Sequence, residues 1–395
     1  MRRNWQILPL LAALGAAFGG CSHLHNPSAK PEANSFSVVT NAIQTVKAKY
    51  APDPHLAIFT VGAQPQGSEL VLTGDVDRAE AKMDVLRAVQ GTGAKVVDRI
   101  KVLPDPRLGD QVWGISCLSV ASAREQPEHK AEMGTQVWMG DVVRVWKPST
   151  NAMFRWYEVQ TRDGYVAWLE KGTFVRCTRE QVEAWNRSPL LIVTAMEGQI
   201  LEKPAADAQT VSDVVLCDLV KKVGEEGDWY KVVTPDQRIG FLPKAAAEDY
   251  GTWKQSRRAT PENIERTARM FLGRPYFWGC NSPKGFDCSG FSKTVFFLNG
   301  IDLNRNAGAQ ARQGIEVPLN DDLSHLRKGD LIFFGRKPRR GGPARISHVG
   351  IYLGDKLFIQ SSERVRISSL DPNSPLADDY RIESLQAARR FLPEP

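Results

Sequence analysis

The sequence Gly-Phe-Asp-Cys-Ser-Gly-Phe at residues 285–291 places a cysteine, Cys288, at the start of an apolar segment, and Ser-His-Val-Gly-Ile-Tyr-Leu-Gly follows at residues 347–354. The apolar spacing after Cys288 predicts a helix, and the segment around His348 predicts a buried strand. A helix N-terminus lowers the pKa of a thiol, and an adjacent imidazole stabilises the thiolate. The two motifs therefore predict a thiol hydrolase with Cys288 as nucleophile and His348 as its base and acid.

Further motifs lie on either side of Cys288. Gly-Arg-Pro-Tyr-Phe-Trp-Gly-Cys occupies residues 273–280, and Lys-Gly-Asp-Leu-Ile-Phe-Phe at residues 328–334 predicts a second buried strand. In this order and spacing the motifs resemble the NlpC-type cell-wall cysteine peptidases across residues 260–395. The resemblance implies an α+β papain-like domain, in which the helix of Cys288 packs on an antiparallel sheet, and a reaction without metal or cofactor.

The resemblance also implies supporting roles around the nucleophile. A third polar group must orient the imidazole of His348, and the family position that frequently holds His matches Gln360. A glutamine carbonyl oxygen can accept the ring N–H, so we expect Cys288, His348 and Gln360 to form the catalytic set. Tyr276 matches a family tyrosine whose hydroxyl lies near the oxyanion, beside the backbone N–H of Cys288.

Three smaller units precede this domain, and the predicted fold is multidomain. Residues 36–105 alternate between helical and strand-like patterns, with a strand expected at residues 55–61, and resemble the BON modules of bacterial envelope proteins. Residues 106–180 and 188–248 contain short alternating strands and Asp-Gly or Pro-Asp turns, which predict two all-β barrels resembling bacterial SH3-like domains. Nothing in the small α+β module looks catalytic.

The whole combination resembles the γ-D-glutamyl-L-diamino acid endopeptidases, also called dipeptidyl-peptidase VI, which act on muropeptides with a free N-terminal L-Ala and cut after D-Glu. In that family the first barrel closes one end of the cleft. A buried ammonium needs a carboxylate and further hydrogen-bond acceptors. The resemblance suggests Asp287 and Ser289 for this purpose, with Trp278 as an apolar wall, and Glu125 and Tyr165 from the first barrel.

The sequence also departs from the family pattern. Relatives often place an acid directly before the proline where this chain has Gln126, and they carry Asp and Ser where it has Asn306 and Gly308. If these last two positions touch the D-Glu carboxylate, substrate preference is shifted. Cys280 stands where relatives usually have Gly, and it adds a thiol near the site.

The composition excludes few classes of function. Hydrophobic residues make up 42% and charged residues 24% of the chain, which is ordinary for a soluble globular protein. The net charge of +6 suits an anionic cell wall and equally no electrostatic partner, and no nucleic-acid partner is expected.

The six cysteines show no Cys-x-x-Cys pair and no Cys/His spacing typical of zinc, so no metal is expected. Cys117, Cys177 and Cys217 lie among apolar residues and are expected to be small buried fillers. Cys280 and Cys288 are expected to be reduced, because a bridge between them would disable the nucleophile. Histidines other than His348, including the one at position 55, are expected to be ordinary surface or core residues.

The N-terminus has the features of an export signal. Two arginines precede an apolar run at residues 7–18, and Gly-Gly-Cys ends at Cys21, so residues 1–21 predict a secretory signal and residues 22–35 a tether. The ending resembles a bacterial lipobox, although Phe18 replaces the usual aliphatic residue, and it implies acylation of Cys21. Ordinary signal cleavage nearby is the alternative. The protein is therefore expected to be lipid-anchored in the cell envelope or periplasmic.

The sequence leaves three functions open. The leading hypothesis is an endopeptidase that trims peptidoglycan stem peptides, with muropeptides as partners and the membrane reached through Cys21. One alternative is an endopeptidase of intact, crosslinked wall that uses the barrels as wall binders. The other is a non-catalytic wall-binding protein with an inert peptidase domain. A capped substrate amine distinguishes the first two, because it abolishes cleavage only if the free amine is recognised.

Overall fold

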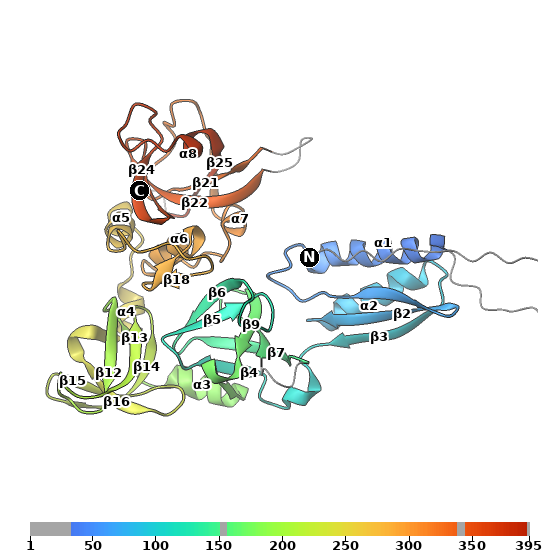
Figure 1. Ribbon diagram of the computed structural model, residues 1–395, viewed down its shortest axis with the longest axis horizontal. Coiled ribbons are helices and arrows are strands. Elements are labelled where there is room, and N and C mark those ends of the chain that lie inside the picture. The colour runs from blue at the N-terminus through green and yellow to red at the C-terminus, as the bar shows by residue number, and fades with distance from the viewer. Residues whose placement is uncertain (1–32, 151–155, 338–343, 393–395) are drawn as a thin grey trace, which may run out of the picture.

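The computed structural model describes residues 33–150, 156–337 and 344–392. Four units follow one another along the chain, and Figure 1 shows the first barrel at the centre, with the N-terminal module beside it and the C-terminal domain above. The predicted export signal and Cys21 lie outside the described residues. Among the described residues, no helix combines the length and apolar character needed to cross a bilayer.

The N-terminal module packs two helices on one three-stranded sheet. Its elements are α1 (Ala33–Tyr50), β1 (Gly62–Gln66), β2 (Glu69–Val76), α2 (Ala79–Gln90) and β3 (Val96–Val102), and the strand order is β1-β2-β3. Strand β3 runs parallel to β2 because α2 crosses over between them, and buried apolar side chains of both helices and the sheet form one core.

Two expectations for this part of the chain are wrong. Helix α1 begins at Ala33, inside the segment expected to be a tether. Residues 55–61 do not form a strand: residues 54–56 make a turn, and only Phe59 forms an isolated bridge, to Val76. The alternating pattern there is overridden because the backbone carbonyls of His55 and Leu56 bind the first barrel instead of a neighbouring strand.

The first barrel is built from seven short antiparallel strands. It contains η1 (Pro106–Leu108), β4 (Trp113–Ser116), β5 (Val120–Arg124), β6 (Met133–Trp138), β7 (Val142–Pro148), β8 (Trp156–Gln160), β9 (Val166–Glu170), η2 (Lys171–Thr173) and β10 (Phe174–Cys177), in the order β10-β4-β7-β8-β9-β5-β6. Inward-facing residues alternate with outward-facing ones along β7 and β9, which is the pattern that a half-buried strand requires. Helix α3 (Arg179–Arg187) follows, capped by Thr178.

The second barrel repeats the topology of the first. It contains β11 (Leu190–Val193), β12 (Glu197–Leu201), β13 (Thr210–Val215), β14 (Leu219–Glu226), β15 (Trp229–Val233), β16 (Ile239–Pro243), η3 (Lys244–Ala246) and β17 (Ala247–Asp249). Its order, β17-β11-β14-β15-β16-β12-β13, matches that of the first barrel strand for strand. Two tandem copies of one β fold are therefore present.

The C-terminal domain places helices on an antiparallel sheet. Helix α4 (Tyr250–Ser256) precedes the domain and contacts β11 and β17 of the second barrel. The helices of the domain are α5 (Pro261–Arg269), α6 (Cys288–Phe297), α7 (Ala307–Gln310) and α8 (Asp379–Ser384), and β18 (Asn281–Ser282) and β19 (Gly285–Phe286) form a small hairpin. The sheet contains β20 (Ile315–Val317), β21 (Leu331–Arg336), β22 (Arg345–Gly354), β23 (Leu357–Ser362), β24 (Arg364–Ser369) and β25 (Leu385–Arg390), in the order β20-β25-β21-β22-β23-β24. Helix α6 packs on β22 and β23, as the sequence predicts.

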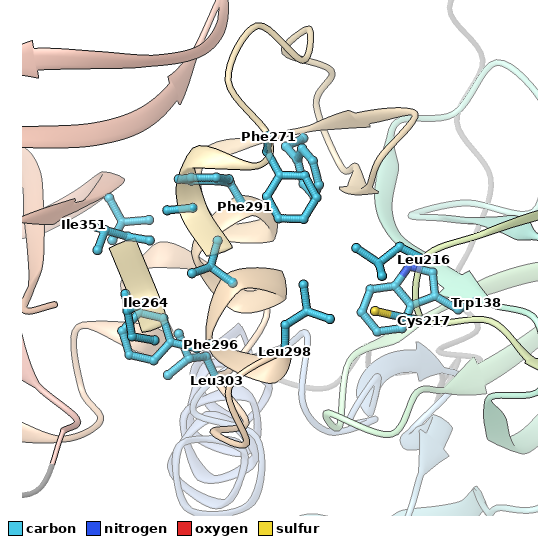
Figure 2. Close-up of a cluster of buried hydrophobic side chains, with 14 of the residues drawn as sticks. Trp138, Leu216, Cys217, Ile264, Phe271, Phe291, Phe296, Leu298, Leu303 and Ile351 are labelled. Atoms are coloured by element: carbon cyan, nitrogen blue, oxygen red, sulfur yellow. The ribbon is translucent and has the colours of Figure 1, made fainter. Parts of the chain in front are cut away.

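The barrels and the C-terminal domain share one hydrophobic core. Figure 2 shows Trp138, Leu216 and Cys217 of the barrels facing Leu298 at the end of α6. The ring of Trp138 also lies 5.4 Å from that of Phe297. Because this apolar surface is buried between the units, separating them would expose it to water at a cost in free energy. The first barrel is thus held firmly against the domain that carries Cys288.

Candidate active site

Cys288 is the first residue of α6, and its helix is fixed by the residue before it. Asp287 is the N-cap, and its Oδ1 accepts a hydrogen bond of 2.7 Å from the backbone N–H of Gly290. Gly290 permits a close approach in this first turn, because a Cβ there would lie 2.1 Å from the carbonyl oxygen of Cys280. The chain therefore holds the Cys288 sulfur at the positive end of a short, buried helix.

Both carboxylate oxygens of Asp287 accept hydrogen bonds from within the protein. Besides Gly290, the carboxylate accepts hydrogen bonds from the backbone N–H of Gly279 at 2.9 Å and from both terminal nitrogens of Arg305. Arg305 is only 1% exposed, and it also donates to the hydroxyls of Ser289 and, across the domain boundary, Thr135. Asp287 and Ser289 thus lie at the nucleophile, as expected, but their polar atoms serve Arg305 and the helix cap.

His348 and Gln360 are hydrogen-bonded across neighbouring strands. The Nε2 of His348 on β22 lies 2.7 Å from the Oε1 of Gln360 on β23, and both side chains are buried. The amide nitrogen of Gln360 donates to Ser368 Oγ and to Asp378 Oδ2, each at 2.9 Å. These two bonds fix the amide orientation, so that its oxygen faces the imidazole. His348 therefore carries its proton on Nε2 and presents Nδ1 as the free acceptor.

Burial shifts the pKa values of the nucleophile and its partner in opposite directions. It raises the pKa of the Cys288 thiol to about 12, and the charge of Asp287 adds to this, while the backbone N–H of Val349 and the charge of Arg305 oppose it. Burial also lowers the pKa of His348 to about 3, assisted by the charge of Arg381. Burial therefore favours the uncharged thiol and the neutral imidazole, and a proton transfer from one to the other would create both charges together.

Tyr276 lies beside this pair. Its backbone N–H donates to Glu363 at 2.8 Å, and burial together with the negative charge that Cys288 can carry raises the pKa of its hydroxyl. The phenol therefore remains protonated and can donate a hydrogen bond at neutral pH.

A cavity of about 500 Å³ opens over Cys288 and is built by three units of the chain. The C-terminal domain contributes Tyr276, Trp278, Asp287, Ser289, Asn306, Gly308, Arg312 and Arg345, the first barrel Glu125, Glu132, Gly134 and Tyr165, and the N-terminal module Asp53 and His55. A second cavity of about 310 Å³ is lined by His348, Glu363, Tyr380 and Arg381. Tyr276 and Ser347 line both cavities. Cys288 thus lines the first of two adjoining cavities and His348 lines the second.

The first barrel places an acid and a phenol in the larger cavity. The hydroxyl of Tyr165 donates to Glu125 Oε1 at 2.7 Å, and burial with this bond raises the pKa of the phenol. Gly134 makes room for the pair, because a Cβ there would lie 2.2 Å from Glu125 Oε1. Both residues were singled out from the sequence, whereas Glu132, which lines the same wall, was not.

The N-terminal module also reaches the site, which the sequence did not indicate. His55 was expected to be an ordinary surface or core residue, but it lines the cavity together with Asp53. No local pattern could have shown this, because the placement depends on docking between units. Arg305 was likewise missed, since its role depends on a carboxylate in another segment.

The cysteines that the structure describes are all free thiols. The thiols of Cys280 and Cys288 are free, and Cys117, Cys177 and Cys217 are free and buried as expected. Among the described residues, no group of three or more His, Cys, Asp or Glu side chains is arranged to hold a metal ion.

Comparisons with known proteins agree with this architecture. Residues 273–383 match the NlpC/P60 family, and residues 123–172 match the bacterial dipeptidyl-peptidase Sh3 domain. The chain is 31% identical to a gamma-D-glutamyl-L-lysine dipeptidyl-peptidase of Bacillus cereus over 59% of this chain and 66% of the relative, and 32% identical to that of Bacillus subtilis over 41% and 52%. It is 25% identical to dipeptidyl-peptidase 6 of Lysinibacillus sphaericus over 65% of this chain and 91% of the relative.

A solved structure shares the fold. An NlpC/P60 family protein from Bacillus cereus superposes with a TM-score of 0.58 and 24% identity, covering 71% of this chain and all of the other. The chain spans 66% and 52% of the two Bacillus relatives named above. With its cysteine, histidine and sheet arranged as described, the chain carries an NlpC/P60 domain at residues 273–383 and an SH3 domain of the bacterial dipeptidyl-peptidase type at residues 123–172.

Proposed function

We propose that this chain is a cysteine endopeptidase that hydrolyses the γ-D-glutamyl-L-diamino acid bond of peptidoglycan stem peptides with a free N-terminal L-Ala. The observation that carries the proposal is the composition of the larger cavity, where Glu125 and Tyr165 face the space over Cys288. Among the described residues, no lysine or arginine lies within ion-pair distance of Glu125. A carboxylate without a lysine or arginine counterion suits a substrate ammonium. The names of the two Bacillus relatives, gamma-D-glutamyl-L-lysine dipeptidyl-peptidases, support the same bond.

The mechanism follows from the geometry around Cys288. As the γ-carbonyl reaches the sulfur, the thiol proton passes to Nδ1 of His348 and the thiolate attacks, forming a thioester after the diamino acid amine leaves with that proton. Water then hydrolyses the thioester with His348 as base. We assign stabilisation of the oxyanion to the backbone N–H of Cys288 and to the hydroxyl of Tyr276, which lines the same cavity as Cys288. Gln360 keeps the proton of His348 on Nε2 throughout.

The roles of Asp287, Ser289 and Trp278 differ from one another. Asp287 and Ser289 are held by Arg305, so we assign them to positioning the nucleophile and leave the first contact with the substrate amine to Glu125 and Tyr165. Trp278 is 60% exposed and lines the cavity, as an apolar wall would.

The second cavity is proposed to take the leaving diamino acid. It lies on the far side of the catalytic pair and carries one acid, Glu363, and one base, Arg381. Charges of both signs suit a product that has amino and carboxylate groups.

The test is a cleavage assay read by mass spectrometry. L-Ala-γ-D-Glu-L-Lys, its diaminopimelate analogue and the N-acetylated form of each are incubated with wild type, Cys288→Ala and Cys117→Ala. Cys117 is a buried thiol of the first barrel outside the cavities, so its variant controls for loss of a cysteine as such. Cleavage of only the free-amine peptides, lost in Cys288→Ala alone, is expected.

Other outcomes would select the alternatives. Equal cleavage of free and acetylated peptides would indicate an endopeptidase of intact wall. Binding to isolated peptidoglycan without cleavage of any peptide would indicate a wall-binding protein.

Export and lipid anchoring are proposed from the N-terminal sequence. The two arginines, the apolar run and Gly-Gly before Cys21 support a lipoprotein signal. Expression in a bacterial host should give a membrane-bound protein whose N-terminal peptide carries acyl mass on Cys21, and Cys21→Ser should release it. An unmodified, cleaved N-terminus would refute the anchor.

A further inference from the structure

The turn that follows α1 is docked on the first barrel next to the larger cavity. The backbone carbonyl of His55 accepts a hydrogen bond of 2.7 Å from Val166 N–H, and that of Leu56 accepts one of 3.1 Å from Gln160 Nε2. In Figure 1 the blue loop that follows α1 extends toward the first barrel. The N-terminal module therefore reaches the site with its backbone fixed to the barrel at His55 and at the residue after it.

Asp53 ties the same turn to the C-terminal domain and orients the imidazole. Its Oδ2 lies 3.0 Å from Arg312 Nη2, and Arg312 also donates to the carbonyl of Gly308 at 2.9 Å. Its Oδ1 accepts from the backbone N–H of His55 at 3.1 Å and lies 3.3 Å from His55 Nδ1. Because a carboxylate only accepts hydrogen bonds, Nδ1 of His55 carries the proton and Nε2 is left as an acceptor.

The ring of His55 completes the wall formed by Glu125 and Tyr165. It stacks on Tyr165 with centroids 5.2 Å apart and planes 20° apart. Its Nε2 lies 3.9 Å from Glu125 Oε2, too far for a direct hydrogen bond between them. The side chain is 38% exposed, and it faces the cavity. Two acceptors thus face each other across a gap that a donor with several N–H groups can bridge.

We propose that His55 is a specificity-determining residue that accepts a hydrogen bond from the substrate ammonium and blocks the space beyond it. This inference rests on the proposed function and extends its amine site into the N-terminal module. A primary ammonium can donate to Glu125 Oε2 and His55 Nε2 at once, whereas an acylated nitrogen has one N–H and no charge. The stacked ring occupies the place that an acyl group would need.

The experiment tests separately the two roles of the His55 side chain, as a hydrogen-bond acceptor and as a ring that blocks space. In the full chain, His55→Ala removes both, and His55→Phe keeps a stacking ring but removes the acceptor. His325→Ala is the matched control, because His325 is an exposed histidine of the C-terminal domain outside both cavities. The values of kcat and KM are measured with L-Ala-γ-D-Glu-L-Lys and its N-acetyl form, and thermal unfolding checks that each variant is folded.

Loss of one hydrogen bond to a charged group predicts an increase in KM of about tenfold for the free-amine peptide in both variants, with kcat nearly unchanged. Only His55→Ala should gain cleavage of the N-acetyl peptide. Binding of the product L-Ala-γ-D-Glu to Cys288→Ala, with and without His55→Ala, should show the same weakening by calorimetry, independently of turnover.

The outcomes distinguish this inference from the proposed function. If wild type cleaves the free-amine peptide and folded His55→Ala keeps its KM and its selectivity, the role of His55 is wrong and the proposed function stands. If wild type cleaves neither peptide, the proposed function falls and the inference falls with it.

Discussion

Arg305 and Asp287 form a bidentate ion pair next to Cys288, and both side chains are almost completely buried. An aspartate directly before the cysteine caps α6, but its negative charge also raises the pKa of the thiol. The charge of Arg305 lowers that pKa and thereby offsets the effect of its partner. The capping residue can therefore carry its charge next to a sulfur that must itself become negative.

Arg305→Gln should damage both folding and nucleophile reactivity. Removing one partner of a buried ion pair is expected to destabilise the fold by about 3–5 kcal/mol, because it leaves a buried charge without a counterion. Cys288 should also react more slowly with iodoacetamide at neutral pH. The control is Arg87→Gln, which breaks an exposed pair with Asp84. Equal reactivity of Cys288 in wild type and Arg305→Gln would contradict the electrostatic role.

Gln360→Leu should lower kcat with little change in KM. Without the 2.7 Å bond to Nε2, the imidazole of His348 loses its fixed tautomer and orientation. Misplacing a catalytic group in this way is expected to cost about a hundredfold in rate. Gln360→His, which restores a polar partner, should keep more activity than Gln360→Leu. Full activity of the leucine variant would show that Gln360 does not position His348.

His348 should make the fold sensitive to acid. Its pKa is 6.5 when exposed and about 3 in the fold, so between these values the unfolded chain binds more protons than the folded chain. Stability contributed by the neutral imidazole is therefore lost as the pH falls from 6.5 toward 3, with a slope of at most about 1.4 kcal/mol per pH unit. His348→Gln should reduce the slope of unfolding free energy against pH in urea titrations, whereas His325→Gln should not. Identical slopes for wild type and His348→Gln would refute the assignment.

A buried ion pair fastens α6 to the first barrel. Lys293 Nζ lies 3.3 Å from Asp163 Oδ2, and both side chains are at most 10% exposed. Asp163→Asn leaves the ammonium without its counterion and is expected to cost about 3–5 kcal/mol of unfolding free energy. The double variant Asp163→Leu with Lys293→Met should recover most of the loss. A double variant no more stable than Asp163→Asn would show that the charges themselves stabilise the contact.

Gly279→Ala should push the first barrel away from the nucleophile. A Cβ at this position would lie 2.2 Å from the carbonyl oxygen of Met133, and its φ of +77° adds a backbone penalty of about 1–2 kcal/mol. Gly67→Ala has a similar φ of +62° but meets nothing within 4 Å, so it measures the backbone penalty alone. Activity and stability should fall further in Gly279→Ala. Equal losses of activity and stability in the two variants would mean that Met133 moves aside at no measurable cost in free energy.

The parts of the site that sequence predicts are those set by neighbouring residues. A cap, a cysteine and an apolar run specify α6 locally, and the alternating apolar residues around His348 specify β22 in the same way. Arg305 and His55 could not be assigned, because each acquires its role from a residue far away in the chain: Asp287 for the first, Tyr165 for the second. The strand expected at residues 55–61 is wrong for the same reason, since docking on the barrel decides the backbone of that turn.

The three-unit cavity has a consequence for product size. The wall at Glu125 and the sulfur of Cys288 belong to units joined by one apolar core, so the span between them is constant. Under the proposed function, a peptide whose amino group contacts that wall would present to the sulfur only the carbonyl at a fixed number of bonds from its amino terminus. Cleavage would then release a product of constant length in every turnover, whatever residues follow downstream.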